Sequence, residues 1–271
     1  MVSRRKRTRK QHRRHRGGDI EPHGCGVFEI IHDDNAFYFI KKKNRRAINC
    51  ITVTDKQDRT LYLDSFFYDL MDDESKICKS SCDSQKIGKK AMDLVLKKFK
   101  EHHGKYDRIY LYDDAKGKGP WKIGDVEIDM EDFCLSVDSA LKRGLCYYEQ
   151  MFFGADQGGY DNRIQQLCEI SAYRIYENVG TQKQNIIDIA KTTSLCGLYL
   201  LIKHRKVIDD NDKNVLGNYL HQACFSLLFP ISTTFVYVMD DAMRRSHEER
   251  LSRIEREYLK KYNDLELIYR S

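Results

Sequence analysis

Apolar and polar residues alternate in short runs at the start of the chain and in long runs towards its end. Between residues 27 and 69, runs rich in aromatic and β-branched residues are separated by short groups of turn-forming residues. This pattern is typical of neighbouring antiparallel strands. The sequence therefore predicts a four-stranded meander with strands at 27–31, 36–42, 47–54 and 60–69.

The next segment, residues 81–104, begins with small polar residues and continues as a helix. Its apolar residues recur at helical spacing, opposite a face of lysines: Ile87, Ala91, Leu94, Val95 and Phe99. Asp83 or Ser84 suits the N-cap position, and Gly104 suits the end. This beginning is typical of a phosphate-binding helix N-terminus and also of an ordinary capped helix.

The remaining pattern predicts an α+β fold, in which a mixed, mainly antiparallel sheet with helices is followed by an α-helical domain. A strand at 106–112, a loop at 115–125, a helix at 130–144 and a strand at 145–153 complete the first domain, residues 25–155. Long runs with helical period follow from residue 156 to residue 271. We expect these helices at 160–178, 184–204, 212–229 and 240–262.

Two apolar patterns in the helical part have alternative interpretations. In the last helix, Met243, His247, Leu251, Ile254 and Tyr258 form one stripe. We interpret it as a docking face on its own domain, with a coiled-coil seam as the alternative. The tract at 223–239 is interrupted by a proline and by hydroxyl side chains. We therefore interpret it as a buried core segment, and expect no membrane span.

Positive charge is concentrated at the N-terminus. Residues 4–16 hold nine Lys and Arg and no acidic residue, namely Arg4, Arg5, Lys6, Arg7, Arg9, Lys10, Arg13, Arg14 and Arg16. Outside them 47 − 9 = 38 basic residues face 41 acidic ones, a formal charge of −3. We expect residues 1–24 to be a disordered basic arm that binds a polyanion. Its predicted partner is nucleic acid, DNA or RNA, or a nuclear import receptor.

The cysteines and the N-terminal sequence indicate the cellular compartment in which the protein is located. Nine cysteines, an odd and scattered number, are more typical of a reducing compartment than of a disulfide framework. A signal peptide has an apolar segment after its positively charged start, and no such segment follows the arm. We therefore expect an intracellular protein, in the nucleus or in a virion, and not a secreted one. Zinc binding by Cys78 and Cys82 with His102 and His103 is disfavoured by their spacing, and no metal site is predicted.

The order of elements over residues 27–153, with two local motifs, resembles the GCN5-related N-acetyltransferase superfamily. In that family a meander leads to a pyrophosphate-binding loop and helix, then to a strand, a helix and a final strand with aromatic residues. Gln85 and Gly88 match the loop motif, whereas Lys90 stands where the family has a small residue. The resemblance implies that Gln85, Gly88 and Lys90 would contact the coenzyme A pyrophosphate.

The second motif is the aromatic segment "CYYEQMFF", which resembles the family's Tyr-Glu-Lys-Leu-Gly-Phe. Tyr148 then matches the family's general acid, which protonates the departing coenzyme A thiolate. Phe152 stands in place of the family's glycine. No convincing general base is present, since Asp64 and Glu127 are both interpreted as solvated carboxylates.

These departures favour a protein without catalytic activity. Our first hypothesis is a nucleic-acid-associated structural or interaction protein on a degenerate acetyltransferase-like fold, with no cofactor. The second is an active N-acetyltransferase that uses acetyl-CoA. The third is a virion-associated assembly protein whose C-terminal helices contact protein partners, because the composition resembles that of proteins from large DNA viruses. The substrate, if any, is not indicated.

Overall fold

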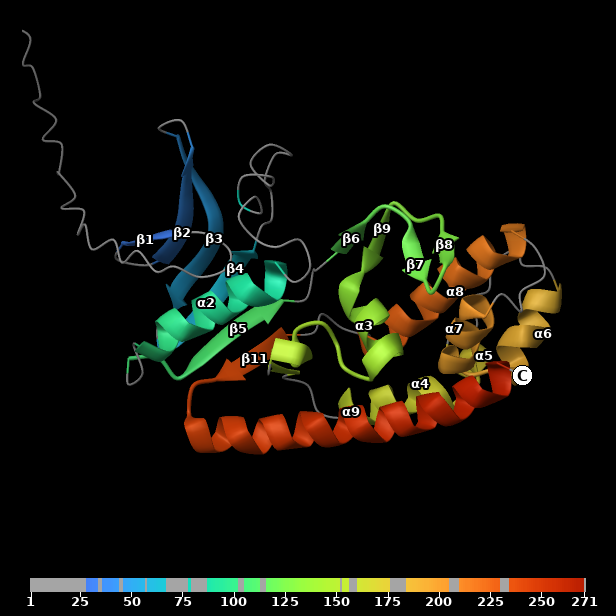
Figure 1. Ribbon diagram of the computed structural model, residues 1–271. Coiled ribbons are helices and arrows are strands. Elements are labelled where there is room, and N and C mark those ends of the chain that lie inside the picture. The colour runs from blue at the N-terminus through green and yellow to red at the C-terminus, as the bar shows by residue number, and fades with distance from the viewer. Residues whose placement is uncertain are drawn as a thin grey trace, which may run out of the picture. The chain divides into compact units, whose positions relative to one another are not determined.

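The computed structural model of the chain (Figure 1) is described over the following residues: 28–33, 36–43, 46–56, 58–66, 78, 87–101, 105–112, 116–151, 153–155, 160–175, 184–204, 210–229 and 234–270. The basic arm, residues 1–24, lies outside this range. The backbone divides into two compact units, Met1–His102 and His103–Ser271. We describe each unit by itself.

The first unit contains the predicted meander. Its strands are β1 (Glu29–His32), β2 (Ala36–Lys43), β3 (Arg46–Lys56) and β4 (Thr60–Phe66), and they pair as antiparallel neighbours in chain order. The tight connection between the first two strands is held by Asp33, whose carboxylate accepts the Ala36 N–H at 2.9 Å. Apolar residues of β2, β3 and β4 are buried, among them Phe39, Ile51 and Leu61. The strand prediction is confirmed in order and approximate bounds.

One helix, α2 (Ile87–Glu101), packs against this sheet. The ring of Phe99 lies edge-on to Phe37 and Phe39, with centroids 4.9 and 6.4 Å apart. Ala91, Met92 and Val95 on the same face are fully buried. The period-3.6 pattern therefore predicted the helix and its buried face, while its predicted caps, Asp83 or Ser84 and Gly104, lie outside the described residues.

The second unit has its own antiparallel strands. β11 (Thr234–Val238) lies between β5 (Arg108–Tyr112) and β10 (Gly154–Ala155) and pairs with both. This strand was not predicted, and it lies between the predicted helices 212–229 and 240–262. Phe235 and Tyr237 of β11 are buried on one face, so the second half of the apolar tract is a buried strand, in agreement with its interpretation as a buried core segment.

Residues 116–134 form two pairs of short antiparallel strands. A loop and the start of a helix were predicted for this segment. β6 (Lys116–Lys118) pairs with β9 (Asp132–Cys134), and β7 (Trp121–Ile123) pairs with β8 (Val126–Ile128). The helix predicted from residue 130 begins later, as α3 (Leu135–Arg143). Buried Trp121 donates its indole N–H to Asp138 at 2.7 Å, which fixes α3 against these strands.

Helices make up the rest of the second unit (Figure 1). They are α4 (Tyr160–Glu169), α5 (Ala172–Ile175), α6 (Gln184–Thr192), α7 (Leu195–Lys203), α8 (Asp210–Leu228) and α9 (Asp241–Arg270). Two of the predicted long helices are each broken in two, and Ser194 caps the second part of one break. Among the described residues, no helix is long and apolar enough to cross a membrane.

The apolar stripe of α9 packs on its own unit, as the docking-face interpretation predicted. Leu251, Ile254, Tyr258 and Tyr262 are buried, and α9 contacts α3, α4 and α7. Met243, at the start of the stripe, is 59% exposed and lies outside this packed face. The central helix α7 is buried almost all round, which explains why its sequence is apolar on every side.

Candidate functional site

The basic arm, the strongest functional signal of the sequence, lies outside the described residues. All nine of its Lys and Arg residues therefore remain a prediction from sequence, and so does Gln85 of the proposed pyrophosphate loop. Gly88 and Lys90 fall in the first turn of α2, which begins at Ile87 and carries no acidic residue there. The first backbone N–H groups of any helix lack intrahelical acceptors. This geometry fits both original interpretations of the segment.

Tyr148 does not lie on a strand, so the predicted strand at 145–153 is wrong. Helix α3 ends at Gly144, which adopts a left-handed conformation with φ of 71°. A turn and the short 3-10 helix η1 (Glu149–Met151) follow before β10. Hydrogen bonds hold the turn: the Cys146 N–H donates to Glu149 at 2.8 Å, and the Tyr147 N–H donates to the Ser136 hydroxyl at 3.0 Å.

The side chain of Tyr148 is 6% exposed and packs among other aromatic rings. Its ring centroid lies 5.3 Å from Tyr147, 6.2 Å from Phe153 and 6.0 Å from Phe235. A general acid must reach the atom that it protonates. The packing therefore gives Tyr148 a core role, as aromatic runs commonly have.

The carboxylates considered as bases have ordinary surface environments. Glu127 on β8 pairs with Lys122 at 2.9 Å, and the hydrogen bond from this lysine holds the pKa of Glu127 below its usual value. A lowered pKa makes a weaker base. Asp64 is exposed on β4, where partial burial raises its pKa and the charge of Lys56 opposes the rise.

The sequence did not identify a polar cluster where α9 meets β10. Gly154 lies directly under the ring of His247, and a β-carbon at this position would overlap that ring. Arg250 binds Asp161 of α4 at 3.2 Å and lies 3.3 Å from Nδ1 of His247. Burial, followed by the charge of Arg250, lowers the pKa of His247. Since Arg250 already has a carboxylate partner, this cluster fastens α9 to α4.

Beside this cluster, the surface of α9 carries further cationic side chains. A shallow hollow is lined by three arginines with one acidic residue, namely Arg250, Arg253 and Arg256 with Glu249, and by Met243, Ser246 and His247. Arg253 and Arg256 are exposed. Guanidinium groups spaced along a helix suit contacts with phosphates. This arginine hollow therefore offers the exposed guanidinium groups of Arg253 and Arg256 to an anion.

A second buried histidine lies in the core of the same unit. The Cys134 N–H donates to Nε2 of His221 at 2.9 Å, and the imidazole ring lies edge-on to Trp121 and stacks on Phe225. Burial lowers the pKa of His221 to about 4. His221 is therefore neutral at physiological pH and acts as a fixed acceptor in the core. Its environment indicates structure and not proton transfer.

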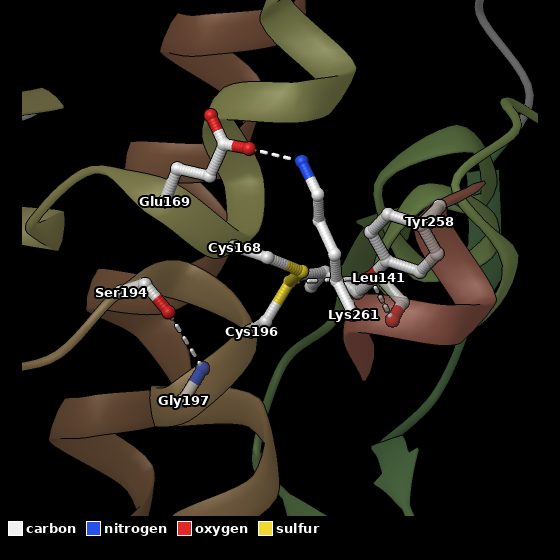
Figure 2. The surroundings of a disulfide bond; sticks show 8 residues. All are labelled: Leu141, Cys168, Glu169, Ser194, Cys196, Gly197, Tyr258 and Lys261. Atoms are coloured by element: carbon white, nitrogen blue, oxygen red, sulfur yellow. Dashed lines mark hydrogen bonds and ion pairs between the residues drawn. A yellow bond between two sulfur atoms is a disulfide. The ribbon is translucent and has the colours of Figure 1, made fainter. Parts of the chain in front are cut away.

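The cysteines overturn one expectation from the sequence. Cys50 is bonded to Cys78, and Cys168 is bonded to Cys196 (Figure 2), while Cys134, Cys146 and Cys224 take part in neither of these bonds. The prediction against a disulfide framework is wrong for these four residues. A disulfide-bonded Cys78 also has no thiolate to offer zinc. Among the described residues, no three His, Cys, Asp or Glu side chains gather as metal ligands do.

A comparison of the chain with protein-family models, with curated proteins and with solved structures found no match.

Proposed function

We propose that this chain is a nucleic-acid-associated structural or interaction protein, in which the basic arm binds phosphates and the body is a scaffold without catalytic activity. The observation that carries the proposal is the separation of charge. Nine cationic residues stand within residues 4–16, and the remaining 38 basic and 41 acidic residues nearly balance. Such an arm binds nucleic acid by releasing counterions and contributes little base specificity.

The acetyltransferase-like scaffold is part of the proposal. Its support is the order of the described elements: the four-stranded meander β1–β4 is followed by α2 and then by β5, and α3 and β10 follow after the short strands β6 to β9. The buried position of Tyr148 and the presence of Lys90 and Phe152 at small-residue positions favour a scaffold over an enzyme. We therefore expect no acetyl-CoA binding.

A role in virion assembly is the second candidate, and the disulfides favour it. Structural disulfides persist in oxidising surroundings, including virion surfaces, and are rare in the nucleus. Two disulfides cross-link described residues of the body, one in each unit. They remove the cysteine argument for a reducing compartment, and they favour a virion over the nucleus as the location that we propose. Exposed residues of the C-terminal helices would then contact protein partners.

Salt-dependent DNA binding tests the proposal. Affinity for a short labelled duplex should fall linearly on a log–log plot against salt, with a slope of about −4 to −7 if about five to eight cations engage phosphates. Two duplexes of unrelated sequence should bind alike. The matched control is the full chain with all nine Lys and Arg of residues 4–16 replaced by Gln, which should lose most of the affinity and most of the slope.

Two outcomes would contradict the proposal. If the Gln-substituted chain binds as tightly with the same slope, the arm is not the binding element. The Arg253→Ala/Arg256→Ala variant would then test the arginine hollow as the site. If acetyl-CoA raises the melting temperature of the chain, the native state binds it, and the N-acetyltransferase hypothesis replaces ours, with Gly88→Pro as the variant that should abolish the shift.

A further inference from the structure

The disulfide between Cys168 and Cys196 joins two helix ends (Figure 2). Cys168 is the next-to-last residue of α4, and Cys196 is the second residue of α7. Helix α9 passes beside the bond and presents Tyr258 and Lys261 to it (Figure 2). The two sulfur atoms therefore have different neighbours.

The two sulfur atoms also differ in access. Cys196 is fully buried, whereas Cys168 is partly exposed. Cys168 lines a small cleft between α4 and α9, with Ile254, Tyr258 and Lys261 on its other side. The cleft is about the size of a single water molecule. Of the two cysteines, Cys168 is therefore the one that faces this cleft, at whose edge the exposed Lys261 side chain lies, whereas Cys196 is fully buried.

The surroundings of Cys196 suit a leaving thiolate. It lies in the first turn of α7, where Ser194 is the N-cap and accepts the Gly197 N–H at 3.1 Å. The N-terminal end of a helix carries a partial positive charge and lowers the pKa of a cysteine there.

A phenol donor lies next to the same sulfur. The Tyr258 oxygen is 3.3 Å from the Cys196 sulfur and donates its proton to the Leu141 carbonyl at 2.6 Å (Figure 2). Burial raises the pKa of Tyr258 well above its usual value, so the hydroxyl keeps its proton. A sulfur atom in a disulfide is a poor acceptor of a hydrogen bond from this hydroxyl, whereas a thiolate sulfur is a good acceptor. The hydroxyl is therefore placed to turn to Cys196 when the bond opens.

We propose that the Cys168–Cys196 disulfide is a thiol-exchange site, at which an external thiolate attacks Cys168 and Cys196 leaves as a thiolate. In this step the incoming sulfur forms a bond with the Cys168 sulfur, and the Cys168–Cys196 bond breaks with its electron pair on Cys196. A second external thiolate then attacks the mixed disulfide and frees Cys168 as a thiolate. The external thiols are oxidised to their disulfide, which balances the two electrons. The inference is independent of nucleic-acid binding.

The other described disulfide provides an internal comparison. Cys50 and Cys78 are 1% and 0% exposed, so neither sulfur has an accessible side. The carbonyl of Cys78 accepts a hydrogen bond from the buried Lys41 at 3.0 Å, which holds that residue in place. We expect this bond to resist external thiols while the first unit stays folded.

Selective reduction of the full chain tests the proposal. Free thiols are first blocked with N-ethylmaleimide, the chain is treated with reduced glutathione, and the mixed disulfide is located by peptide mass spectrometry. Cys168–Cys196 should open on the order of tenfold faster than Cys50–Cys78, because attack requires access to a sulfur, and glutathione should be found on Cys168. Glutathione on Cys196, or equal rates for the two bonds, would overturn the proposal.

The Tyr258→Phe variant tests the leaving sulfur, and the sign of its effect is decisive. Loss of the hydroxyl removes the hydrogen bond that would stabilise the leaving thiolate, so reduction should slow by about three- to tenfold. A hydroxyl with only a structural role would loosen the packing when removed, and reduction would become faster. Tyr262→Phe is the matched control, since the Tyr262 hydroxyl lies one turn further along α9 and binds Lys203 at 3.2 Å. A faster or unchanged rate in Tyr258→Phe would overturn the assignment.

Discussion

The two described disulfides close loops of equal length in opposite surroundings. Cys50–Cys78 in the first unit and Cys168–Cys196 in the second each join residues that are 28 apart in sequence. Both cysteines of the first bond are buried, and the Cys78 carbonyl accepts a hydrogen bond from Lys41 of β2. The second has one buried sulfur and one on the edge of a cleft.

This comparison separates two properties of a disulfide that are often treated as one. The stability that a cross-link provides depends mainly on the loop that it closes in the unfolded chain. Its reactivity depends on access to a sulfur and on the stability of the leaving thiolate in the folded chain. Equal loops should therefore give equal stabilisation, while unequal surroundings give unequal rates of exchange.

Removal of either disulfide should have the largest effect on stability. The chain-entropy relation for a loop of this length gives about 3.6 kcal/mol for each bond. We expect the Cys50→Ala/Cys78→Ala and Cys168→Ala/Cys196→Ala variants to lose similar amounts in urea unfolding. A difference of more than about 2 kcal/mol between them would mean that native contacts, and not loop closure, dominate the contribution of at least one bond.

Acid should act on the second unit in particular. His221 has a folded-state pKa of about 4, below the unfolded value of 6.5, so the unfolded chain binds this proton first as the pH falls. The stability due to neutral His221 is complete above pH 6.5 and is lost as the pH falls towards 4. The loss reaches about 3 kcal/mol from the size of the shift. The lowered pKa of His247 acts in the same direction.

Hydrogen exchange at pH 7 and pH 4.5 would check this prediction unit by unit. Amides of residues 103–271 should lose protection in acid before those of the first unit. In His221→Phe the acid-dependent part should be smaller, although the variant loses stability at neutral pH because the Cys134 N–H loses its acceptor. Equal loss of protection in both units would contradict the assignment of acid sensitivity to His221.

The position of Tyr258 beside the second disulfide depends on a glycine. Gly144 has φ of 71°, and a β-carbon there would overlap the Tyr258 ring. We expect Gly144→Ala to cost about 2–4 kcal/mol, because left-handed strain and overpacking add. Gly119→Ala is the matched control, since Gly119 has φ of 84° with open space around it, and it should cost only about 1 kcal/mol.

Thiol reduction adds a second measurement to this pair of variants. Displacement of Tyr258 in Gly144→Ala should widen the cleft at Cys168 and change the reduction rate of the second disulfide alone. Gly119→Ala should change neither rate. If Gly144→Ala and Gly119→Ala prove equally stable, the overlap at Tyr258 is relieved elsewhere, and Gly144 has no special role beside the disulfide.

Regular patterns could be predicted from the sequence because they are local. The period-two runs of β1 to β4 and the period-3.6 face of α2 each follow from burial of one side of one element. The stripe of α9 was found for the same reason. By contrast, the run at 145–153 is rich in aromatic residues for packing in a turn, and its composition does not distinguish this from a strand.

Long-range partners could not be predicted in the same way. β11 pairs with β10 and with β5, which lies more than a hundred residues earlier in the chain, and these pairings make residues 234–238 a strand. Cysteine spacing does not reveal which residues meet, so neither disulfide was expected. Tyr258 was identified as a stripe residue, but its contacts with Leu141 and Cys196 depend on how three helices pack.

The smallest expected effect on stability comes from Lys261 at the rim of the cleft. It forms an ion pair with Glu169 (Figure 2), and the two side chains are 43% and 50% exposed. Exposed pairs contribute little, so Lys261→Ala should change stability by less than about 1 kcal/mol. The variant should nevertheless change which thiols react, because removal of a positive charge beside Cys168 disfavours an anionic reagent relative to a cationic one.

The ratio of reduction rates by 3-mercaptopropionate and by cysteamine measures this effect without depending on stability. A single charge several ångströms away in water changes such a ratio by about two- to fivefold, and salt reduces the change. Lys260→Ala is the control, because Lys260 is exposed on a different side of α9 and does not line the cleft. If the ratio is the same in Lys261→Ala and in the unaltered chain, thiols do not approach Cys168 through this cleft, and the contrast between the two disulfides then depends on local opening of α4 instead.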